Sequence, residues 1–305
     1  MNTIKNLNNN CPLCGSVKKS TKWKIKDVTY VKCNDCTLIY QDPQPSYEYL
    51  KDLYSEKYYV NETEPTDSVG YQNYTDEYTK LIALDFYKLL EKYKHTNSKY
   101  ILDIGCATGN FLEIAKYKGW DVTGIEISEW SSNIGKSKGL NIYPKLLHEC
   151  NFESNYFDVI TMFDVIEHFQ NPVKEIIEIH RILKPNGILI IETPNIESFT
   201  TKFIYGKGSD LVKPNAHLVL LSSKTIKLLL VKHGFKIINI KKIPLTRKYR
   251  HFLNNYMRRL LKKILCKIDY KIGPINLKAY TKKPECVDLP KLTINDILQV
   301  IASKE

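Results

Sequence analysis

Four of the eight cysteines stand in two Cys-x-x-Cys pairs near the start of the chain, Cys11 with Cys14 and Cys33 with Cys36. Each pair can place two sulfurs on one side of a metal ion, and four thiolates complete the tetrahedral shell that zinc prefers. A redox dithiol would need only one pair, so a redox role or unrelated turn cysteines explain the pattern less well. The spacing therefore predicts a small zinc ribbon whose four ligand positions are filled, which makes the site structural.

A glycine-containing loop follows the first strand expected in the main domain, in the sequence ILDIGCATGNF. Gly105 and Gly109 allow a tight turn and a close approach of backbone N–H groups to a ligand. A loop of the nucleoside-triphosphatase type is excluded because Asn110 and Phe111 stand where Lys and Ser or Thr are needed. A dinucleotide site is disfavoured because the spacing is G-x-x-x-G and an acid, Asp103, precedes the loop. That carboxylate would repel a pyrophosphate but could hold a cationic amino group.

A second acid, Glu126, ends the next expected strand in DVTGIEIS, 23 residues after Asp103. A carboxylate at this place can accept hydrogen bonds from both hydroxyls of a ribose. The two acids together suit a ligand with an amino-acid end and an unphosphorylated nucleoside. S-adenosylmethionine is such a ligand, and the sequence predicts it as the cofactor.

The glycine-containing loop and Glu126 can bind one ligand only if a sheet places the ends of their two strands side by side. From residue 99 onward, short apolar runs alternate with helical patterns such as Phe111–Lys118 and Val173–Leu183, which is typical of parallel strands covered by helices on both faces. The sequence therefore predicts an α/β, Rossmann-like fold with its ligand at the carboxyl ends of the strands. The expected strands are Tyr100–Ile104, Asp121–Ile125, Phe157–Phe163, Gly187–Glu192, Phe235–Ile243 and Ile275–Thr281.

Five motifs, ILDIGCATGNF, GIEIS, FDVITMFDVIEHFQNP, ILKPNGILIIETPN and HGFKI, resemble the class I S-adenosylmethionine-dependent methyltransferases in order and spacing. The resemblance covers about residues 99–283. It implies a seven-stranded, mostly parallel sheet with one antiparallel strand, for which Ile275–Thr281 is the candidate. It also implies contacts with the cofactor: Asp103, Gly105 and Gly109 at the methionine part, Glu126 at the ribose, Ile127 and Leu147 beside the adenine, and Phe163 or Asp164 near the sulfonium.

The N-terminal part of the chain indicates which group of methyltransferases the sequence resembles. A zinc ribbon followed by a tyrosine-rich linker and this catalytic domain is similar to methyltransferases of glycan and natural-product pathways, including sugar methyltransferases. In that group a glycine commonly follows the last cysteine, whereas Thr37 and Leu38 follow Cys36 here. The resemblance implies methyl transfer to a small-molecule or glycan acceptor, first of all an oxygen of a sugar or other small polyol, while carbon and nitrogen acceptors stay open.

Asp164, Glu167 and His168 follow the expected strand Phe157–Phe163, and a helical turn there would put them on one face. Three hypotheses stay open for them. His168 could be a general base on an acceptor hydroxyl, because its ordinary pKa is near neutrality. With His217, the three could instead bind a divalent ion, as in the metal-assisted small-RNA 2′-O-methyltransferases and ubiquinone-pathway O-methyltransferases that this stretch resembles. In the third hypothesis, Glu167 and His168 only cap helices and hold the sheet edge.

The positive charge is concentrated in one segment. The chain has 45 Lys and Arg against 33 Asp and Glu, and residues 241–283 hold 14 of the basic residues with a single acid. Within this segment, residues 246–272 have the pattern of a basic amphipathic helix. Such a helix could pack with its charges solvated, or contact an anionic membrane surface or a lipid-linked substrate. It could also bind RNA together with the ribbon, either in an RNA methyltransferase or in a non-catalytic binding module.

The composition is that of a globular protein, and the length fits one large domain with an accessory module. We expect a zinc ribbon in residues 1–42, a tyrosine-rich linker with helices in 43–98, the catalytic domain in 99–283 and a tail in 284–305. A polar N-terminus and no run of about 18 apolar residues predict a cytoplasmic protein, which the basic helix could bring to a membrane surface.

Overall fold

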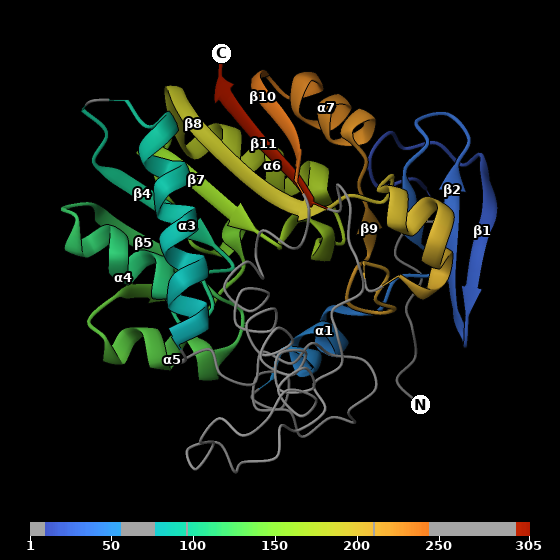
Figure 1. Ribbon diagram of the computed structural model, residues 1–305, viewed down its shortest axis with the longest axis horizontal. Coiled ribbons are helices and arrows are strands. Elements are labelled where there is room, and N and C mark those ends of the chain that lie inside the picture. Colours follow the sequence, from blue (N-terminus) through green and yellow to red (C-terminus); the bar gives the residue numbers. More distant parts are fainter. Residues whose placement is uncertain (1–9, 56–76, 96, 210, 244–296) are drawn as a thin grey trace, which may run out of the picture.

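The computed structural model describes residues 10–55, 77–95, 97–209, 211–243 and 297–305, which form two sheets connected by helices and loops (Figure 1). The larger sheet has seven strands and the smaller has four. The predicted basic helix at 246–272 and the candidate strand Ile275–Thr281 lie outside the described residues. Within the described part of the chain, no helix is long and apolar enough to cross a membrane.

The larger sheet has the strand order β10-β11-β8-β7-β4-β5-β6. The strands from β8 to β6 are parallel, and β11 runs antiparallel to both of its neighbours, β8 and β10. This is the Rossmann-like arrangement that the sequence predicts. The strands are β4 (Tyr100–Ile104), β5 (Asp121–Ile125), β6 (Asn141–Tyr143), β7 (Phe157–Phe163), β8 (Leu183–Pro194), β10 (Phe235–Ile243) and β11 (Ile297–Lys304).

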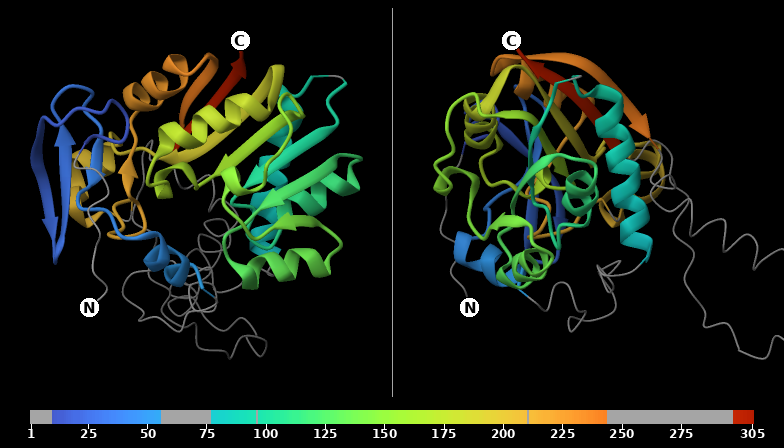
Figure 2. Two further views of the ribbon diagram at one scale, coloured as in Figure 1. Left: turned by 180° about the vertical axis from the view of Figure 1, so that it is seen from behind. Right: turned by 90° about the vertical axis from the view of Figure 1, so that its left-hand side faces the viewer.

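The two faces of this sheet carry separate apolar cores. Neighbouring residues of one strand point to opposite faces, so that Leu102 belongs to one core and Ile101 to the other. The helices α3 (Glu77–Tyr93) and α4 (Asn110–Tyr117) cover one face, and α6 (Pro172–Ile182) and α7 (Ser223–Lys232) cover the other (Figures 1 and 2). The other helical elements are α1 (Tyr47–Leu53), α5 (Glu129–Ser137), η1 (Leu147–Glu149), η2 (Ile166–His168), η3 (Thr200–Tyr205) and η4 (Gly206–Gly208).

The smaller sheet forms the N-terminal part, and all of its strand pairs are antiparallel. Its strands are β1 (Lys19–Ile25), β2 (Val28–Cys33), β3 (Ile39–Gln41) and β9 (Val219–Leu220). The first three come from the predicted ribbon, but β9 comes from the catalytic domain, which the sequence did not predict. We call residues 10–44 the cysteine-rich module. Because β9 pairs with β3, this module is joined to the catalytic domain by backbone hydrogen bonds.

One prediction about the end of the chain is wrong. The antiparallel strand of the large sheet is β11, within the segment 284–305 that was expected to be a tail. Residues 297–302 of this strand are all buried, between β8 and β10. The run ILQVIA is long enough for a buried strand, but a short apolar run near a chain end becomes a central strand only by pairing with distant partners.

Candidate active site

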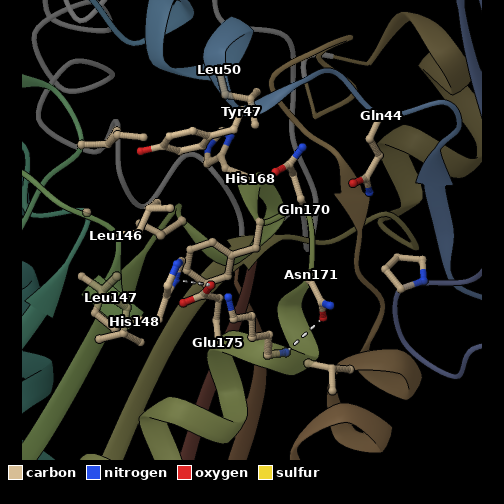
Figure 3. A pocket seen from close by; sticks show the side chains of 18 of the residues that line it. Gln44, Tyr47, Leu50, Leu146, Leu147, His148, His168, Gln170, Asn171 and Glu175 are labelled. Atoms are coloured by element: carbon tan, nitrogen blue, oxygen red, sulfur yellow. Dashed lines mark hydrogen bonds and ion pairs between the residues drawn. The ribbon is translucent and has the colours of Figure 1, made fainter. Parts of the chain in front are cut away.

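A cavity of about 750 Å³ opens at the carboxyl ends of β4, β5 and β7, between the large sheet and the cysteine-rich module (Figure 3). Its walls include Gly105 after β4, Glu126 after β5 and Asp164 after β7. On the opposite side lie residues 10–15 and 40–44 of the cysteine-rich module, together with Tyr47, Leu50 and Tyr54 of the α1 segment. The size is typical of a small-molecule site. The cavity is therefore bounded both by the sheet and by the N-terminal segment.

Most of the residues that the resemblance assigns to the cofactor line this cavity, but two do not. Gly105, Glu126, Ile127, Leu147, Phe163 and Asp164 are all in its wall. Asp103 is buried behind Gly105 with 4% of its surface exposed, and Gly109 is the N-cap residue of α4. The structure therefore brings the predicted set together at the cavity, except for Asp103 and Gly109.

The loop after β4 depends on glycine and on Glu126. Gly105 has φ +72°, and a Cβ on it would lie 2.4 Å from Val165 Cγ2. Glu126 is buried, and its two carboxylate oxygens accept hydrogen bonds from Ala107 N at 2.9 Å and Ser128 N at 2.8 Å. The carboxylate thus joins the glycine loop to the N-terminus of α5. Any variant at Glu126 will affect this loop as well as a ligand's hydroxyls.

Asp103 is a buried acid with one strong hydrogen bond, which Thr161 Oγ1 donates to its Oδ1 at 2.6 Å. Burial raises the pKa of Asp103 from 3.8 to about 7, even though the Thr161 hydrogen bond lowers it. The neighbouring Glu126 carboxylate raises it further. A cation bound close to this carboxylate would favour its charged form, which is consistent with the amino group that the sequence suggested.

We expect Asp103→Asn to change the pH dependence of stability in the ligand-free protein. The pKa of Asp103 is higher in the folded than in the unfolded state, so its contribution is fully present below about pH 4 and is lost as pH rises through about 7. Relative to wild type, the variant should therefore gain on the order of a few kcal/mol between pH 5 and pH 8. Urea unfolding of both proteins at the two pH values measures this change. An unchanged difference would show that Asp103 ionises normally.

Glu167, His168 and His217 form a second group of side chains, which we call the His–Glu cluster; His168 lines the cavity, and Glu167 and His217 are buried next to it. One ligand atom from each lies within 4.8 Å of the others. Asp164 is not in this group, although the sequence hypothesis included it. The predicted helical turn is not formed from Asp164 onward, because Asp164 has φ +57° and only Ile166–His168 makes a 3₁₀ turn. The side chains therefore meet through the fold, with His217 arriving from the segment before β9.

Backbone carbonyls hold both histidine rings. His168 Nδ1 lies 2.8 Å from Ala216 O, and His217 Nδ1 lies 2.9 Å from Leu211 O. Because a carbonyl oxygen can only accept, we assign the proton to Nδ1 in both rings, which leaves the lone pair on Nε2. In His168, Nδ1 also lies 2.8 Å from the Tyr54 hydroxyl. His168 Nε2 lies 3.9 Å from Glu167 Oε1, and Thr193 donates to Glu167 Oε2 at 2.8 Å. Burial lowers the pKa of His168 to about 4 and that of His217 well below its usual range, so both are neutral at pH 7.

The four cysteines of the two pairs also meet in space. Cys11 Sγ lies 3.5 Å from Cys36 Sγ, Cys14 Sγ lies 3.6 Å from Cys33 Sγ, and all four are within 4.8 Å of one another. A tetrahedral zinc site with Zn–S bonds of about 2.3 Å requires sulfur separations of about 3.8 Å. Burial raises the pKa of Cys36 to about 12, and a cation would reverse this preference for the thiol. The donor set and its spacing fit a zinc ion.

The turn after the last cysteine keeps its shape without glycine. Gly15 has φ +76°, and its N–H donates to Cys11 O at 2.9 Å. Thr37 occupies the equivalent place in the second pair, with φ +72° and a hydrogen bond from its N–H to Cys33 O at 3.1 Å. The departure of this sequence from the glycine usual there therefore leaves both turns alike.

Sequence reasoning missed several polar residues of the cavity wall. Gln44, His148 and Glu175 come from three different segments and face the same space (Figure 3). His148 Nδ1 lies 3.9 Å from Glu175 Oε1, and burial raises the pKa of Glu175 to about 7. A signal existed for Glu175, because it lies four residues before the buried Ile179 and seven before Ile182, beside the apolar stripe of α6. No local signal marks Gln44 or His148.

The fold and this cavity define an enzyme class. A sheet of six strands in parallel orientation with one antiparallel strand, and a glycine loop and an acid at neighbouring strand ends, is the arrangement that the resemblance to S-adenosylmethionine-dependent methyltransferases implied. Residues 74–240, more than half of the chain, match the family model of the methyltransferase domain. The chain belongs to this methyltransferase family.

Individual proteins show how far this likeness extends. An uncharacterised protein of Methanocaldococcus jannaschii is 31% identical over 186 residues, which are 60% of this chain and 75% of that protein. A ubiquinone biosynthesis O-methyltransferase of Photobacterium profundum is 26% identical over 122 residues, which are 38% of this chain and about half, 52%, of that enzyme. The crystal structure of an S-adenosylmethionine-dependent methyltransferase from Archaeoglobus fulgidus has a TM-score of 0.50 and 16% identity, covering 85% of this chain and all of that one. This last likeness concerns the fold.

Proposed function

We propose that the protein transfers a methyl group from S-adenosylmethionine to a hydroxyl oxygen of a small polyhydroxylated acceptor, such as a sugar, in a glycan or natural-product pathway. The observation that carries the proposal is the His–Glu cluster, in which two neutral histidines and a carboxylate converge and His168 lines the cavity. This arrangement suits activation of a hydroxyl group. The O-methyltransferases of ubiquinone biosynthesis among the similar proteins support oxygen as the accepting atom.

In this proposal Glu167, His168 and His217 hold a divalent cation. The donor set fits, because an imidazole that donates its Nδ1–H to a carbonyl presents Nε2 in a fixed direction, as metal-binding histidines commonly do. When bound, the cation would orient the acceptor hydroxyl and lower its pKa. The protein aligns the acceptor oxygen with the methyl carbon and the sulfur, and S-adenosylhomocysteine leaves as a neutral thioether when the C–S bond breaks.

The polar wall formed by Gln44, His148 and Glu175 supports a hydroxyl-rich acceptor. An amide, an imidazole and a carboxyl group offer both donors and acceptors, which hydroxyl groups can satisfy. The sugar or polyol proposal is supported by this lining and by the order of cysteine-rich module, tyrosine-rich linker and catalytic domain, which resembles that of sugar methyltransferases. A membrane surface, a lipid-linked acceptor or RNA as partner of the segment 241–283 stays a prediction, because that segment is largely outside the described residues.

A second candidate mechanism uses His168 alone as the proton acceptor. The specific observation in its favour is the hydrogen bond to Ala216 O, which leaves the Nε2 lone pair of a neutral ring available. Against it, burial lowers the pKa of His168 to about 4, which makes the ring a weak base at neutral pH. The two mechanisms share their residues but differ in their need for a cation.

The cysteine-rich module completes the proposal. Cys11, Cys14, Cys33 and Cys36 hold one structural zinc ion, whose four positions leave none for a substrate. Their separations support this role, and so does the position of Cys11 and Cys14 in the cavity wall, where a rigid turn would shape the acceptor side.

Binding of Mn²⁺ tests the cation site directly. We expect the full-length protein to bind one Mn²⁺ per chain in an electron paramagnetic resonance titration, and His217→Ala to weaken that binding at least about 100-fold. His233→Ala is the matched control, because His233 is half-buried and its Nδ1 bonds Leu229 O at 2.7 Å away from the cavity. The affinity for S-adenosylhomocysteine should stay within about twofold in both variants.

Measurements of activity after chelation distinguish the cation mechanism from the mechanism in which His168 is the base. Methyl transfer to a panel of sugars and polyols would be measured after chelation that leaves the zinc content unchanged. Activity that is lost on chelation and restored by Mn²⁺ or Mg²⁺ is the expected result. Activity that survives exhaustive chelation, but is lost in His168→Ala with cofactor affinity intact, would replace the cation by the His168 base.

A further inference from the structure

Tyr30 connects the cysteine-rich module to the His–Glu cluster through a single peptide group. The carbonyl oxygen of His217 accepts a hydrogen bond from the Tyr30 hydroxyl at 2.8 Å. The N–H of the same peptide group, which belongs to Leu218, donates to the carbonyl oxygen of Glu167 at 2.8 Å. Because a peptide group is planar and rigid, its two bonds cannot be adjusted independently. The Tyr30 hydroxyl therefore influences how the backbone of Glu167 and His217 is held together.

The carbonyl oxygen of Ala216, the residue before His217, is hydrogen-bonded to His168, the third residue of the His–Glu cluster. Ala216 O accepts from His168 Nδ1 at 2.8 Å, and this bond holds the ring together with the Tyr54 hydroxyl, which lies 2.8 Å from the same nitrogen. The rings of His168 and His217 also contact each other edge to face, with their centroids 4.9 Å apart. Two successive carbonyls, at 216 and 217, thus bind a ring of the cluster and the Tyr30 hydroxyl respectively.

A second side chain of the cysteine-rich module, that of Gln41, is hydrogen-bonded to the chain segment that contains His217. Gln41 is 1% exposed; its Nε2 donates to Asn215 Oδ1 at 2.8 Å, and its Oε1 accepts from Asn215 N at 2.8 Å. The backbone N–H of Gln41 donates to Leu218 O at 2.8 Å. The segment from Asn215 to Leu218, which contains His217, is therefore bonded to β2 and β3 along its length.

The hydrogen bonds that hold the loop expected to bind the cofactor are separate from those between the cysteine-rich module and residues 215–218. The loop after β4 is held by Glu126, through Ala107 and Ser128, and these bonds involve no residue of the cysteine-rich module. A change in how the module holds residues 215–218 should therefore affect the cluster and leave the cofactor side unchanged.

We propose that Tyr30, assisted by Gln41, is a positioning residue for the His–Glu cluster, so that the cysteine-rich module serves the acceptor side of the reaction. The inference rests on the proposed function, in which this cluster holds a divalent cation. It assigns the N-terminal module a role beyond that of a separate binding domain: its buried tyrosine sets the geometry of ligands supplied by the catalytic domain.

The test is Mn²⁺ binding to the full-length protein with its zinc content verified. Tyr30→Phe removes one hydroxyl and keeps the ring, which is fully buried. We expect it to weaken Mn²⁺ binding about tenfold, since partners that orient metal ligands typically contribute 10- to 100-fold to affinity. Tyr87→Phe is the matched control, because it removes a tyrosine hydroxyl that donates to Glu91 at 2.7 Å on the other face of the sheet. It should leave Mn²⁺ binding unchanged, and both variants should keep the S-adenosylhomocysteine affinity within about twofold.

The outcomes distinguish this inference from the function on which it rests. Wild type that binds no Mn²⁺ overturns the proposed cation site and the positioning role with it. If wild type binds Mn²⁺ and the folded Tyr30→Phe variant binds it equally tightly, the positioning role alone is overturned. The positioning role is also overturned if Tyr30→Phe loses affinity for Mn²⁺ and for S-adenosylhomocysteine to the same extent. Should Tyr30→Phe fail to fold, Gln41→Glu takes its place, because it keeps the side-chain length but removes the donor to Asn215. A loss of about threefold in Mn²⁺ affinity is then expected, and no loss overturns the inference.

Discussion

Replacing Cys33 with serine is expected to release the metal from the cysteine cluster and to lower the melting temperature by about 10 °C or more. Cys33 is fully buried at the end of β2, and its sulfur faces Cys14. Zinc binding in such sites contributes strongly to folding, because the unfolded chain cannot offer four converging thiolates. The cysteines also belong to the apolar cluster that continues into α6 and α7, so the loss should extend into the catalytic domain.

Metal analysis and calorimetric melting measure this effect, with Cys150→Ser as the control. Cys150 is half-buried and its thiol donates to Leu146 O at 3.4 Å, a bond that serine can also make. That variant should keep one zinc per chain and melt within a few degrees of wild type. Purified wild type without zinc, or Cys33→Ser that retains both zinc and melting temperature, would contradict the structural role of the metal.

Replacing Glu126 with alanine is expected to weaken S-adenosylhomocysteine binding by about 100-fold or more. The variant loses two kinds of interaction at once: the carboxylate proposed to accept from the ribose hydroxyls, and the hydrogen bonds from Ala107 N and Ser128 N that hold the glycine loop. Hydrogen bonds to a charged group contribute about 1.5–3 kcal/mol each, so losing two or more gives an effect of this size. Isothermal calorimetry with S-adenosylhomocysteine, and with NAD⁺ as the comparison ligand, measures it.

Glu129→Ala is the matched control for this experiment. Glu129 is an exposed acid three residues further on, in the first turn of α5, and its carboxylate lies 3.8 Å from Lys51 Nζ. An exposed ion pair of this kind contributes little, so cofactor affinity should change by less than about threefold. Glu126→Ala that binds S-adenosylhomocysteine as tightly as wild type would remove Glu126 from the cofactor site.

Much of the central sheet follows from local sequence. The expected strands Tyr100–Ile104, Asp121–Ile125, Phe157–Phe163 and Phe235–Ile243 coincide with observed ones. The first three are short, mostly buried runs, whereas the fourth carries lysines and is buried only at its two ends. Parallel strands place their carboxyl ends at one edge, so the positions of Gly105 and Glu126 beside one cavity could be predicted as well. The convergence of the four cysteine sulfurs could be predicted too. Each Cys-x-x-Cys turn places two sulfurs on one side of a metal ion, and two such pairs supply the four ligands that zinc needs.

Other features depend on contacts between distant segments. The strand β11 pairs with residues more than 100 positions earlier in β8, and β9 pairs with β3 across an even longer separation, so local periodicity could not assign either. The same holds for His217, which reaches the cluster because β9 joins the small sheet, and for Asp164, whose positive φ takes it out of the predicted turn.

The sequence by itself predicted the methyltransferase class and the residues expected at the cofactor, because these predictions come from short motifs whose chemistry depends on residue type and spacing. Tertiary structure decided which of those residues reach the cavity, which ionise abnormally and how the cysteine-rich module meets the His–Glu cluster. Burial raises the pKa of Asp103 and Glu175 and lowers that of His168, and burial is a property of the packed chain. The proposed acceptor side thus depends on long-range packing, whereas the residues expected at the cofactor follow from local motifs.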